Sequence, residues 1–367
     1  MATDRIVSAE AIDADTPTGT PVGSPAGNPA GADEERTNHA LRPERIGDYV
    51  GQRGLIERLS IAIEASRRRG DPLEHLLLHG PPGLGKTTLA HVAAHEMNAS
   101  VTVTSGPALA RGTDLVGALT RLKAGDVLFI DEIHRLPAAV EEFIYPAMED
   151  FRIDVPLDTG LNARTVQITV APFTLIGATT RAGLLSSPLR SRFGLAHHLT
   201  YYDHDELMTI LRRSAALLET TAEGDGALER IASRSRGTPR IANRLLRRVR
   251  DYTQVRGAGV LTETLAGEAL ELEGVDALGL DELDRGYLRT IGQTYEGGPV
   301  GLETVAATMN EDPGTLEDVV EPYLLQIGFL ARTRRGRTLT RASAEHLGLK
   351  IKIDDTPEST ADAPGLF

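Results

Sequence analysis

The sequence of 367 residues contains no cysteine, no tryptophan and no long uninterrupted apolar run. The absence of cysteine excludes a disulfide framework and thiolate metal sites. No segment approaches the roughly 18 apolar residues that a membrane-spanning helix needs, and the first residues lack the apolar core of a secretory signal. We therefore expect a cytoplasmic protein that does not enter membranes.

Basic residues are fewer than acidic ones, 39 against 52, so the formal net charge is −13. Taken alone, this value argues against nucleic acid as a partner. However, residues 1–36 hold seven acidic and two basic residues, and residues 353–367 hold four acidic and no basic residues. Both ends are rich in Ala, Gly, Pro, Thr and Asp, a composition that buries too little apolar surface to order itself. We predict disordered tails over residues 1–38 and 353–367, and the net charge does not exclude DNA.

The remaining length suffices for more than one domain. The short apolar runs EHLLLHG, DVLFIDE and FTLIGATT end in glycine or polar residues, as strands buried on both faces of a parallel sheet do. They alternate with helical segments such as GLIERLSIAIEASRRRG, which predicts an α/β domain over residues 39–200. Residues 201–274 have only helical patterns. Residues 275–352 have the order helix, turn, helix and two-stranded hairpin, which is typical of a winged helix.

A glycine-rich segment, GPPGLGKT, begins at Gly80 and fits the phosphate-loop pattern G-x-x-x-x-G-K-[ST] between a predicted strand and a predicted helix. Its glycines allow backbone N–H groups to surround phosphate oxygens at a helix N-terminus. Lys86 would contact the β- and γ-phosphates, and the Thr87 hydroxyl would bind Mg²⁺. The alternative is a glycine-rich turn that matches by chance, which the strand–loop–helix context disfavours.

The strand VLFIDE ends in two carboxylates about 45 residues after the phosphate-loop lysine. Asp131 can reach the Mg²⁺ shell, and Glu132 can act as the base for the attacking water. This pair predicts hydrolysis of ATP, with Mg²⁺, rather than phosphate transfer. Thr179 and Thr180 end the run FTLIGATT, where a hydroxyl such as that of Thr180 can sense the γ-phosphate or orient the water. A plain strand end is the alternative.

Two arginines follow in SSPLRSRFG, at positions 190 and 192. The predicted site still lacks a cation for the charge that develops on the transferred phosphoryl group. Arg190 and Arg192 could supply one to a neighbouring subunit, which would make the active site shared. On the pattern alone, a solvated surface turn is an equal alternative.

The span from about Leu41 to Lys352 resembles the RuvB family, the bacterial ATPases that drive Holliday-junction branch migration. The resemblance is carried by LRPERIGDYVGQ, HGPPGLGKTTLA, DVLFIDEIHRL, YPAMEDF, TLIGATTRAGLLSSPLRSRFG, GTPRIANRLLRRVRDY and EPYLLQIGFLARTRRGR. It implies an AAA+ fold with an α/β P-loop large domain, an all-helical lid and a C-terminal winged-helix domain. It also implies homohexameric rings around duplex DNA.

Site residues follow from the same resemblance. Arg192 matches the arginine finger that acts in trans on the ATP of the adjacent subunit. Arg190 matches a nucleotide-contacting position in the same turn, and Arg240 matches the lid arginine that contacts the γ-phosphate. The other implied nucleotide-binding positions are Leu41, Arg42, Gly83, Gly85, Lys86, Thr87, Thr88, Tyr202 and the backbone of Glu149, Asp150 and Phe151.

An alternating segment, FRIDVPLDTGLNARTVQITVAPF, predicts a β-hairpin within residues 152–171. In proteins that it resembles, the corresponding insertion docks the junction-binding partner RuvA; an ordinary surface hairpin is the alternative. The RuvC resolvase is expected in a larger complex. Candidates for an apolar docking face are Ile153, Val155, Leu157, Val166 and Ile168.

The predicted winged helix has an unusual charge pattern. The second helix of a helix-turn-helix normally enters the major groove, but this one and its lead-in are acidic and contain no lysine or arginine. We therefore predict that the wing contacts DNA, through phosphates rather than base edges. The resemblance indicates Arg332 and Arg337, and leaves Arg334, Arg335 and Arg341 open; a hairpin kept soluble by arginine is the alternative. The acidic residues are Glu311, Asp312, Glu317, Asp318 and Glu321.

Three functions remain open from the sequence. The first is a ring motor that moves duplex DNA and four-way junctions. The second is an AAA+ switch, such as a clamp loader or replication initiator, in which nucleotide drives assembly. The third, a regulatory DNA-binding protein with a vestigial ATPase, is disfavoured because Lys86, Asp131, Glu132 and Arg192 are all present.

Overall fold

The computed structural model describes residues 40–156 and 165–349, so both predicted tails and Leu157 lie outside the described residues. The chain divides into two units, Met1–Leu41 and Arg42–Phe367, and the elements below belong to the second. In the described part, no helix is both long and apolar enough to span a membrane.

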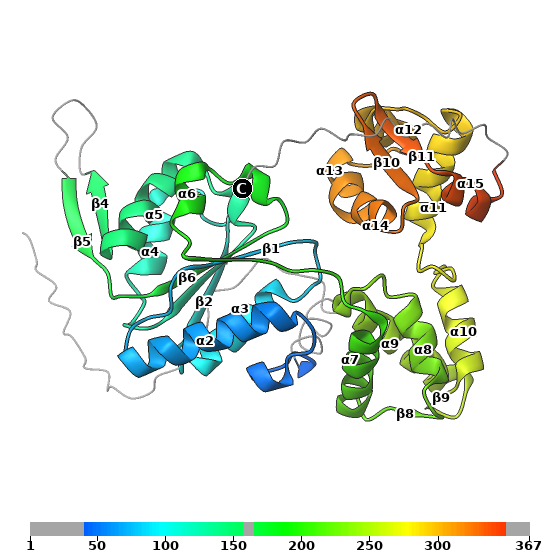
Figure 1. Ribbon diagram of the computed structural model, residues 1–367, viewed down its shortest axis with the longest axis horizontal. Coiled ribbons are helices and arrows are strands. Elements are labelled where there is room, and N and C mark those ends of the chain that lie inside the picture. The colour runs from blue at the N-terminus through cyan, green and yellow to red at the C-terminus, as the bar shows by residue number, and fades with distance from the viewer. Residues whose placement is uncertain (1–39, 157–164, 350–367) are drawn as a thin grey trace, which may run out of the picture. The chain divides into compact units, whose positions relative to one another are not determined.

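A five-stranded parallel sheet forms the centre of the first domain, with strand order β2-β3-β6-β1-β7 (Figure 1). The three predicted strands are the three central ones, β1 (Leu76–His79), β3 (Val127–Asp131) and β6 (Thr174–Thr179). The sequence did not indicate the edge strands β2 (Val101–Ser105) and β7 (Leu195–His198). Half of the residues of β7 are exposed, and in β2 Val103 is exposed and the other four residues are only partly buried, so neither strand forms an apolar run.

Helices cover both faces of this sheet, as Figure 1 shows. Alternate strand residues point to opposite faces. Leu76, Leu78 and Phe129 pack into one core cluster with helices α2 and α3, whereas Leu77 and Leu128 pack into another with α4, α5 and α6. The helical bounds in this domain are η1 (Ile46–Asp48), α2 (Arg53–Arg69), α3 (Lys86–Glu96), α4 (Gly112–Leu119), η2 (Ile133–Arg135), α5 (Ala138–Asp150), η3 (Ala182–Leu184) and α6 (Ser187–Ser191).

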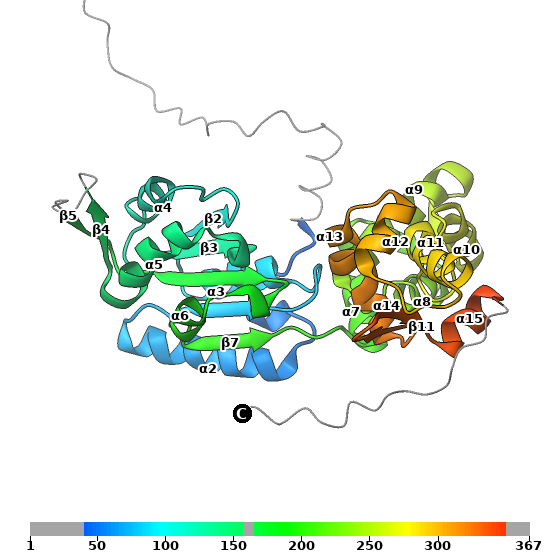
Figure 2. The ribbon, with the colours of Figure 1, turned by 90° about the horizontal axis from the view of Figure 1, so that it is seen from above.

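The predicted hairpin is present as β4 (Arg152–Pro156) and β5 (Thr165–Thr169), which Figure 2 shows beside the end of α5. Ile153 pairs with Ile168, and Val155 with Val166, so all four side chains share one face. Ile153 is fully buried in the large-domain core. The expectation that Ile153 belongs to a docking face is therefore wrong, because this residue anchors the hairpin to the domain.

The lid domain is helical, as predicted, with one addition. Its helices are α7 (His204–Leu217), α8 (Gly226–Ser233), α9 (Pro239–Arg256) and α10 (Glu263–Leu272). The Asp203 carboxylate caps α7 by accepting a hydrogen bond from the Glu206 N–H, and the Glu206 carboxylate accepts one from the Asp203 N–H. The addition is a pair of two-residue parallel strands, β8 (Thr221–Ala222) and β9 (Val260–Leu261).

The last domain is a winged helix with its own core, which includes Tyr287, Leu288, Leu316 and Leu324. The predicted order of helix, turn, helix and hairpin is confirmed, and an additional helix precedes it. The element bounds are α11 (Glu282–Arg289), η4 (Thr290–Thr294), α12 (Leu302–Met309), α13 (Pro313–Thr315), η5 (Leu316–Val320), α14 (Glu321–Gln326), β10 (Leu330–Thr333), β11 (Gly336–Leu339) and α15 (Arg341–Leu347).

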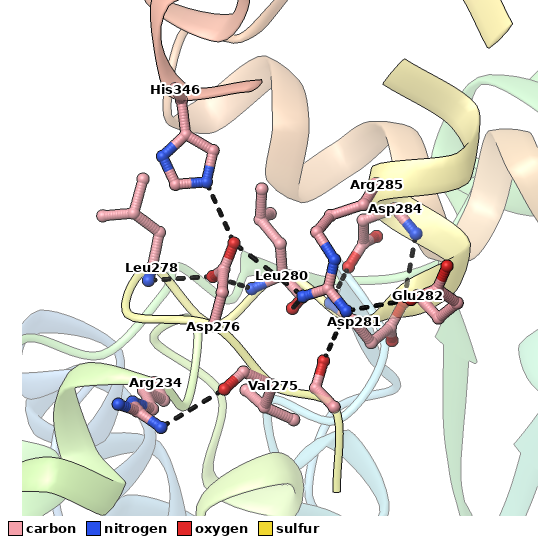
Figure 3. A network of polar contacts seen from close by, with 12 residues as sticks. Arg234, Val275, Asp276, Leu278, Leu280, Asp281, Glu282, Asp284, Arg285 and His346 are labelled. Atoms are coloured by element: carbon pink, nitrogen blue, oxygen red, sulfur yellow. Dashed lines mark hydrogen bonds and ion pairs between the residues drawn. The ribbon is translucent and has the colours of Figure 1, made fainter. Parts of the chain in front are cut away.

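The segment that joins the lid to the winged helix is held by a network of polar contacts (Figure 3). The Asp276 carboxylate accepts hydrogen bonds from the backbone N–H groups of Leu278 and Leu280 and lies 2.9 Å from Nε2 of His346, on α15. Arg285, on α11, donates to the carbonyl oxygens of Leu280 and Gly274. Arg234 of the lid donates to the Val275 carbonyl oxygen. Side chains from both domains therefore fix the connecting segment.

Candidate nucleotide site and DNA-binding wing

The predicted phosphate and metal residues meet at one edge of the sheet, whereas Phe151 lies at the opposite edge, where its ring centre is 6.1 Å from that of Phe173, the residue before β6. The strands β3, β6 and β1 are parallel neighbours, so their carboxyl ends meet at the same edge. Asp131 is the last residue of β3, Thr180 follows β6, and the phosphate loop connects β1 to α3. A crevice outside the carboxyl ends of parallel strands is where α/β proteins bind nucleotides.

The phosphate loop depends on two close approaches that only glycine permits. Gly85 has φ +97°, and a Cβ there would lie 2.7 Å from the Tyr49 hydroxyl oxygen. Gly83 has φ +78°, and a Cβ there would lie 2.7 Å from Cγ2 of Thr238 and 3.2 Å from Cβ of Arg240. The first turn of α9 therefore packs against the loop, which brings the predicted γ-phosphate reader Arg240 next to it.

Lys86 is the first residue of α3 and is only 8% exposed. Its ammonium group donates hydrogen bonds of 2.8 Å to the carbonyl oxygens of Gly80 and Pro81. Burial lowers the pKa of Lys86 to about 8, and the negative charge of Asp131 partly opposes this shift. The cation is thus held within the loop, at the helix N-terminus where phosphate oxygens would bind.

The two carboxylates at the end of β3 are placed differently. Asp131 accepts a 2.9 Å hydrogen bond from the Glu132 backbone N–H. Glu132 has φ +48°, a conformation that costs a non-glycine residue about 1–3 kcal/mol and is concentrated at functional sites. Its exposed carboxylate lies 2.9 Å from Arg135. Arg135 is a partner of the predicted base that sequence reasoning missed.

The threonines at the end of β6 differ in their surroundings. Thr179 is buried, its hydroxyl lies 2.9 Å from Nδ1 of His134, and it accepts a hydrogen bond from the backbone N–H of Arg181. Burial lowers the pKa of His134, although the nearby Glu132 carboxylate opposes this. Thr180 lies just beyond the strand and is partly exposed. Thr180 therefore stays the predicted sensor, while Thr179 and His134 fix the strand end behind it.

The remaining predicted pocket residues lie in mixed environments. Tyr202 is buried, and its hydroxyl oxygen lies 3.3 Å from the Leu84 carbonyl oxygen and 3.2 Å from the Tyr49 hydroxyl oxygen. Burial raises the pKa of Tyr202 to about 12, so its hydroxyl keeps its proton beneath the loop. Leu41 is buried, Arg42, Thr87 and Thr88 are partly buried, and the side chains of Glu149 and Asp150 are exposed.

Arg192 is anchored to its own large domain. Its Nε lies 3.1 Å from Oε1 of Glu149, and its guanidinium carbon lies 4.3 Å from the centre of the Tyr145 ring. Its Nη1 donates to the Pro188 carbonyl oxygen at 2.8 Å. Arg190, two residues earlier, is exposed. The two arginines therefore do not form one solvated turn: Arg192 is held in a fixed position by α5.

The wing arginines are arranged around a buried acid. Arg332 and Arg337 are directly opposite each other on β10 and β11, and both form ion pairs with Glu321. Glu321 is fully buried, so its inclusion in a phosphate-repelling helix surface is wrong: its charge faces the wing. Arg334 and Arg335 at the hairpin turn are exposed, and neither guanidinium has a polar partner among the described residues.

Models of three domain families match consecutive parts of this chain. Residues 41–199 match the Holliday junction DNA helicase RuvB P-loop domain, residues 202–276 the RuvB AAA lid domain, and residues 277–348 the RuvB C-terminal winged helix domain. The chain belongs to the RuvB family. RuvB proteins are P-loop AAA+ ATPases that drive branch migration of Holliday junctions, and this chain is such an ATPase.

Individual RuvB proteins agree with this assignment. The Holliday junction branch migration complex subunit RuvB of Desulfosudis oleivorans is 57% identical over 311 residues, which cover 85% of this chain and 90% of that protein. The solved structure of the Thermotoga maritima RuvB Holliday junction branch migration motor is 49% identical, with a TM-score of 0.78 over 85% of this chain and all of that one. A point mutant of the same protein gives 50% identity, a TM-score of 0.79, and coverage of 85% and 100%.

Proposed function

We propose that this chain forms a homohexameric ring that hydrolyses ATP with Mg²⁺ and translocates duplex DNA, moving Holliday junctions together with RuvA. The observation that carries the proposal is the presence, in one chain, of a phosphate loop beside the two β3 carboxylates and of an arginine-bearing wing. A nucleotide switch of the clamp-loader kind accounts for the first feature only, since the winged helix also matches the RuvB family.

The chemistry at the nucleotide begins with positioning. Backbone N–H groups of the loop and the Lys86 ammonium bind the phosphates, and Arg240 reads the γ-phosphate from the lid. The described residues contain no cluster of three or more His, Asp or Glu that would hold a metal alone, which fits an ion shared with phosphates. Thr87 and Asp131 would hold this Mg²⁺, which would offset phosphate charge. Glu132 accepts the proton of the attacking water, and Thr180 orients that water.

A neighbouring subunit completes the site in this proposal. Arg192 supplies the cation for the transition state in trans, and Arg190 contacts the same nucleotide. The contacts of Arg192 with Tyr145 and Glu149 support this role, because they hold the guanidinium on α5 of its own chain. A finger used in trans needs a neighbouring subunit, and a closed ring of heterologous interfaces, such as a homohexamer, supplies one at every boundary.

Partners follow from the remaining surfaces. The wing contacts DNA phosphates, which suits a motor that must move along any sequence. RuvA docks on the hairpin face formed by Val155, Val166 and Ile168, with Leu157 outside the described residues, and the RuvC resolvase joins a larger complex. The curated relative from Desulfosudis oleivorans is named as a complex subunit, which supports a partner for this chain. The cytoplasm remains the expected location.

The test of this function is ATP-dependent separation of a synthetic four-way junction, with and without RuvA, against a linear duplex as control. We expect separation that requires ATP and is strongly stimulated by RuvA. ATP turnover without any junction movement, even with RuvA present, would favour the nucleotide switch instead.

The hairpin makes a specific prediction about RuvA. Val166 is 42% exposed on the apolar face, and replacing it with glutamate would place an unpaired charge in the docking surface. We expect Val166→Glu to weaken RuvA binding by roughly tenfold or more, measured by titration with labelled RuvA. Thr165→Glu is the matched control, because Thr165 is exposed, pairs with the uncharged Pro156, and neighbouring strand residues point to opposite faces. Equal loss in both variants would argue against this face.

Tyr145 gives a second prediction. Its ring lies under the Arg192 guanidinium, and its hydroxyl donates to Glu141 at 2.6 Å. A cation–π contact contributes about 0.5–2 kcal/mol, so Tyr145→Leu should lower kcat about 2- to 30-fold with little change in KM. Tyr145→Phe keeps the ring and should restore most of the rate. A phenylalanine variant as slow as the leucine variant would show that the hydroxyl, not the ring, is needed.

A further inference from the structure

The two wing arginines occupy a position that is unfavourable without a counter-charge. Arg332 and Arg337 are direct cross-strand partners, so their side chains leave the hairpin on the same face. Like charges at directly opposed positions destabilise a β-hairpin. Without a partner, the two guanidinium groups would separate and sample many rotamers.

Glu321, the first residue of α14, supplies that partner. Its Oε2 accepts from Nε of Arg332 at 2.8 Å, from Nη2 of the same residue and from Nη2 of Arg337 at 3.4 Å. Its Oε1 accepts from Nε of Arg337 at 2.8 Å and from the Tyr287 hydroxyl. Burial favours protonation of Glu321, but the hydrogen bonds from Arg337, Tyr287 and Arg332 outweigh it and hold its pKa below the ordinary value. The Glu321 carboxylate is therefore ionised, and both of its oxygens accept hydrogen bonds.

The same contacts leave donors free on both arginines. A guanidinium has five N–H groups, and Glu321 takes those on Nε and Nη2. Neither Nη1 has a polar partner among the described residues, and the Arg332 side chain is 42% exposed. Glu317 is a weaker neighbour, since it lies 3.9 Å from both Nη2 atoms and 3.1 Å from Arg181. One buried carboxylate thus holds both guanidinium groups from one side.

We propose that Glu321 is a positioning residue for DNA binding: its buried carboxylate holds Arg332 and Arg337 as a pair whose free N–H groups meet the phosphates. The inference rests on the proposed contact between these arginines and DNA. Glu321 itself does not touch DNA and acts only through the two arginines.

Charge and positioning predict opposite effects for the same substitution. Glu321→Gln removes a negative charge next to the DNA-binding wing, so electrostatics alone predicts tighter binding. Glutamine has one acceptor oxygen, and its NH₂ group would face the guanidinium groups. Positioning therefore predicts weaker binding. Glu321→Asp keeps the charge but shortens the side chain, so it should also weaken binding, although charge alone predicts no change.

The experiment measures the affinity of the assembled ring for a labelled linear duplex across a salt series, by fluorescence anisotropy. We expect Glu321→Gln to weaken binding on the order of tenfold and to lower the salt slope by about 2 per wing, as if two phosphate contacts were lost. Glu311→Gln is the matched control, because Glu311 is an exposed acid of the same domain, and it should bind at least as tightly as the wild type.

A second background separates positioning from a loss of fold. In the Arg332→Ala/Arg337→Ala protein, adding Glu321→Gln should weaken DNA binding no further. Equal weakening in both backgrounds, or a Glu321→Gln protein with wild-type affinity and slope, would overturn the inference. If Glu321→Gln has a lower melting temperature than the wild type, the measurement is repeated with Tyr287→Phe. This variant removes one hydrogen bond to the Glu321 carboxylate and should weaken DNA binding about 2- to 5-fold. Unchanged affinity would overturn the inference.

The proposed contact between the wing and DNA is tested separately from the positioning role of Glu321. If the double arginine variant alone keeps the wild-type salt slope, then the wing does not bind phosphates and the DNA part of the proposed function is wrong. If that variant weakens binding and Glu321→Gln does not, only the positioning role of Glu321 is lost.

Discussion

Replacing Arg192 with alanine should reduce ATP turnover by the assembled ring about 10³- to 10⁵-fold, the rate that an arginine finger contributes to phosphoryl transfer. The loss arises because Arg192 is the proposed source, in trans, of a cation for the charge that develops on the equatorial oxygens of the transition state. Nucleotide binding should persist, since Lys86 and the loop backbone are intact. Turnover and binding of labelled ATP are measured on the same preparation. A variant that hydrolyses ATP at the wild-type rate would show that Arg192 is a structural residue held by Glu149 and Tyr145.

Mixed rings test whether this arginine acts in trans. Subunits with Arg192→Ala keep Glu132, and subunits with Glu132→Gln keep Arg192. In a ring of heterologous interfaces, an equal mixture should contain complete sites at about a quarter of the boundaries. Two inactive proteins should therefore regain turnover on mixing. If mixing restores nothing although the subunits exchange, the arginine acts within its own subunit.

Replacing Glu132 with glutamine should slow hydrolysis about 10²- to 10⁴-fold, which is the usual contribution of a positioned general base. Glutamine has nearly the same shape but cannot accept the proton of the attacking water. ATP should still bind, because Asp131 and Lys86 are unchanged, so the variant should accumulate ATP-bound rings.

The matched control for this prediction is Glu142→Gln, since Glu142 is an exposed acid on α5. This variant should hydrolyse ATP at the wild-type rate. If Glu132→Gln also retains most of the turnover, then another group takes the proton, and the strained backbone at Glu132 needs a different explanation.

Local sequence determined what could be predicted of the nucleotide site. The phosphate loop is contiguous, so its glycines, Lys86 and Thr87 follow from spacing alone. The strands β1, β3 and β6 were predictable because their residues are almost all buried, which leaves an apolar run. The edge strands β2 and β7 have a partly exposed side and therefore carry polar residues, which interrupt the apolar run by which a buried strand is predicted.

The residues that were missed or misplaced depend on contacts between distant segments. Tyr145 and Glu149 lie more than 40 residues before the arginine that they hold. Ile153 belongs to an alternating pattern that is correct, but its position at the base of the hairpin buries it. In the sequence, Glu321 is indistinguishable from the four other acidic residues of this region. Its carboxylate faces the wing only because α14 packs against β10 and β11.

The polar joint around Asp276 and Arg285 has a mechanical consequence. A connecting segment with free backbone groups would bend under load and absorb part of any displacement. Here Arg234 of the lid and Arg285 of the winged helix donate to its carbonyl oxygens, whereas its N–H groups donate to its own Asp276. These bonds restrict bending of the segment, so we expect a movement of the lid to be transmitted to the winged helix rather than absorbed between the two domains.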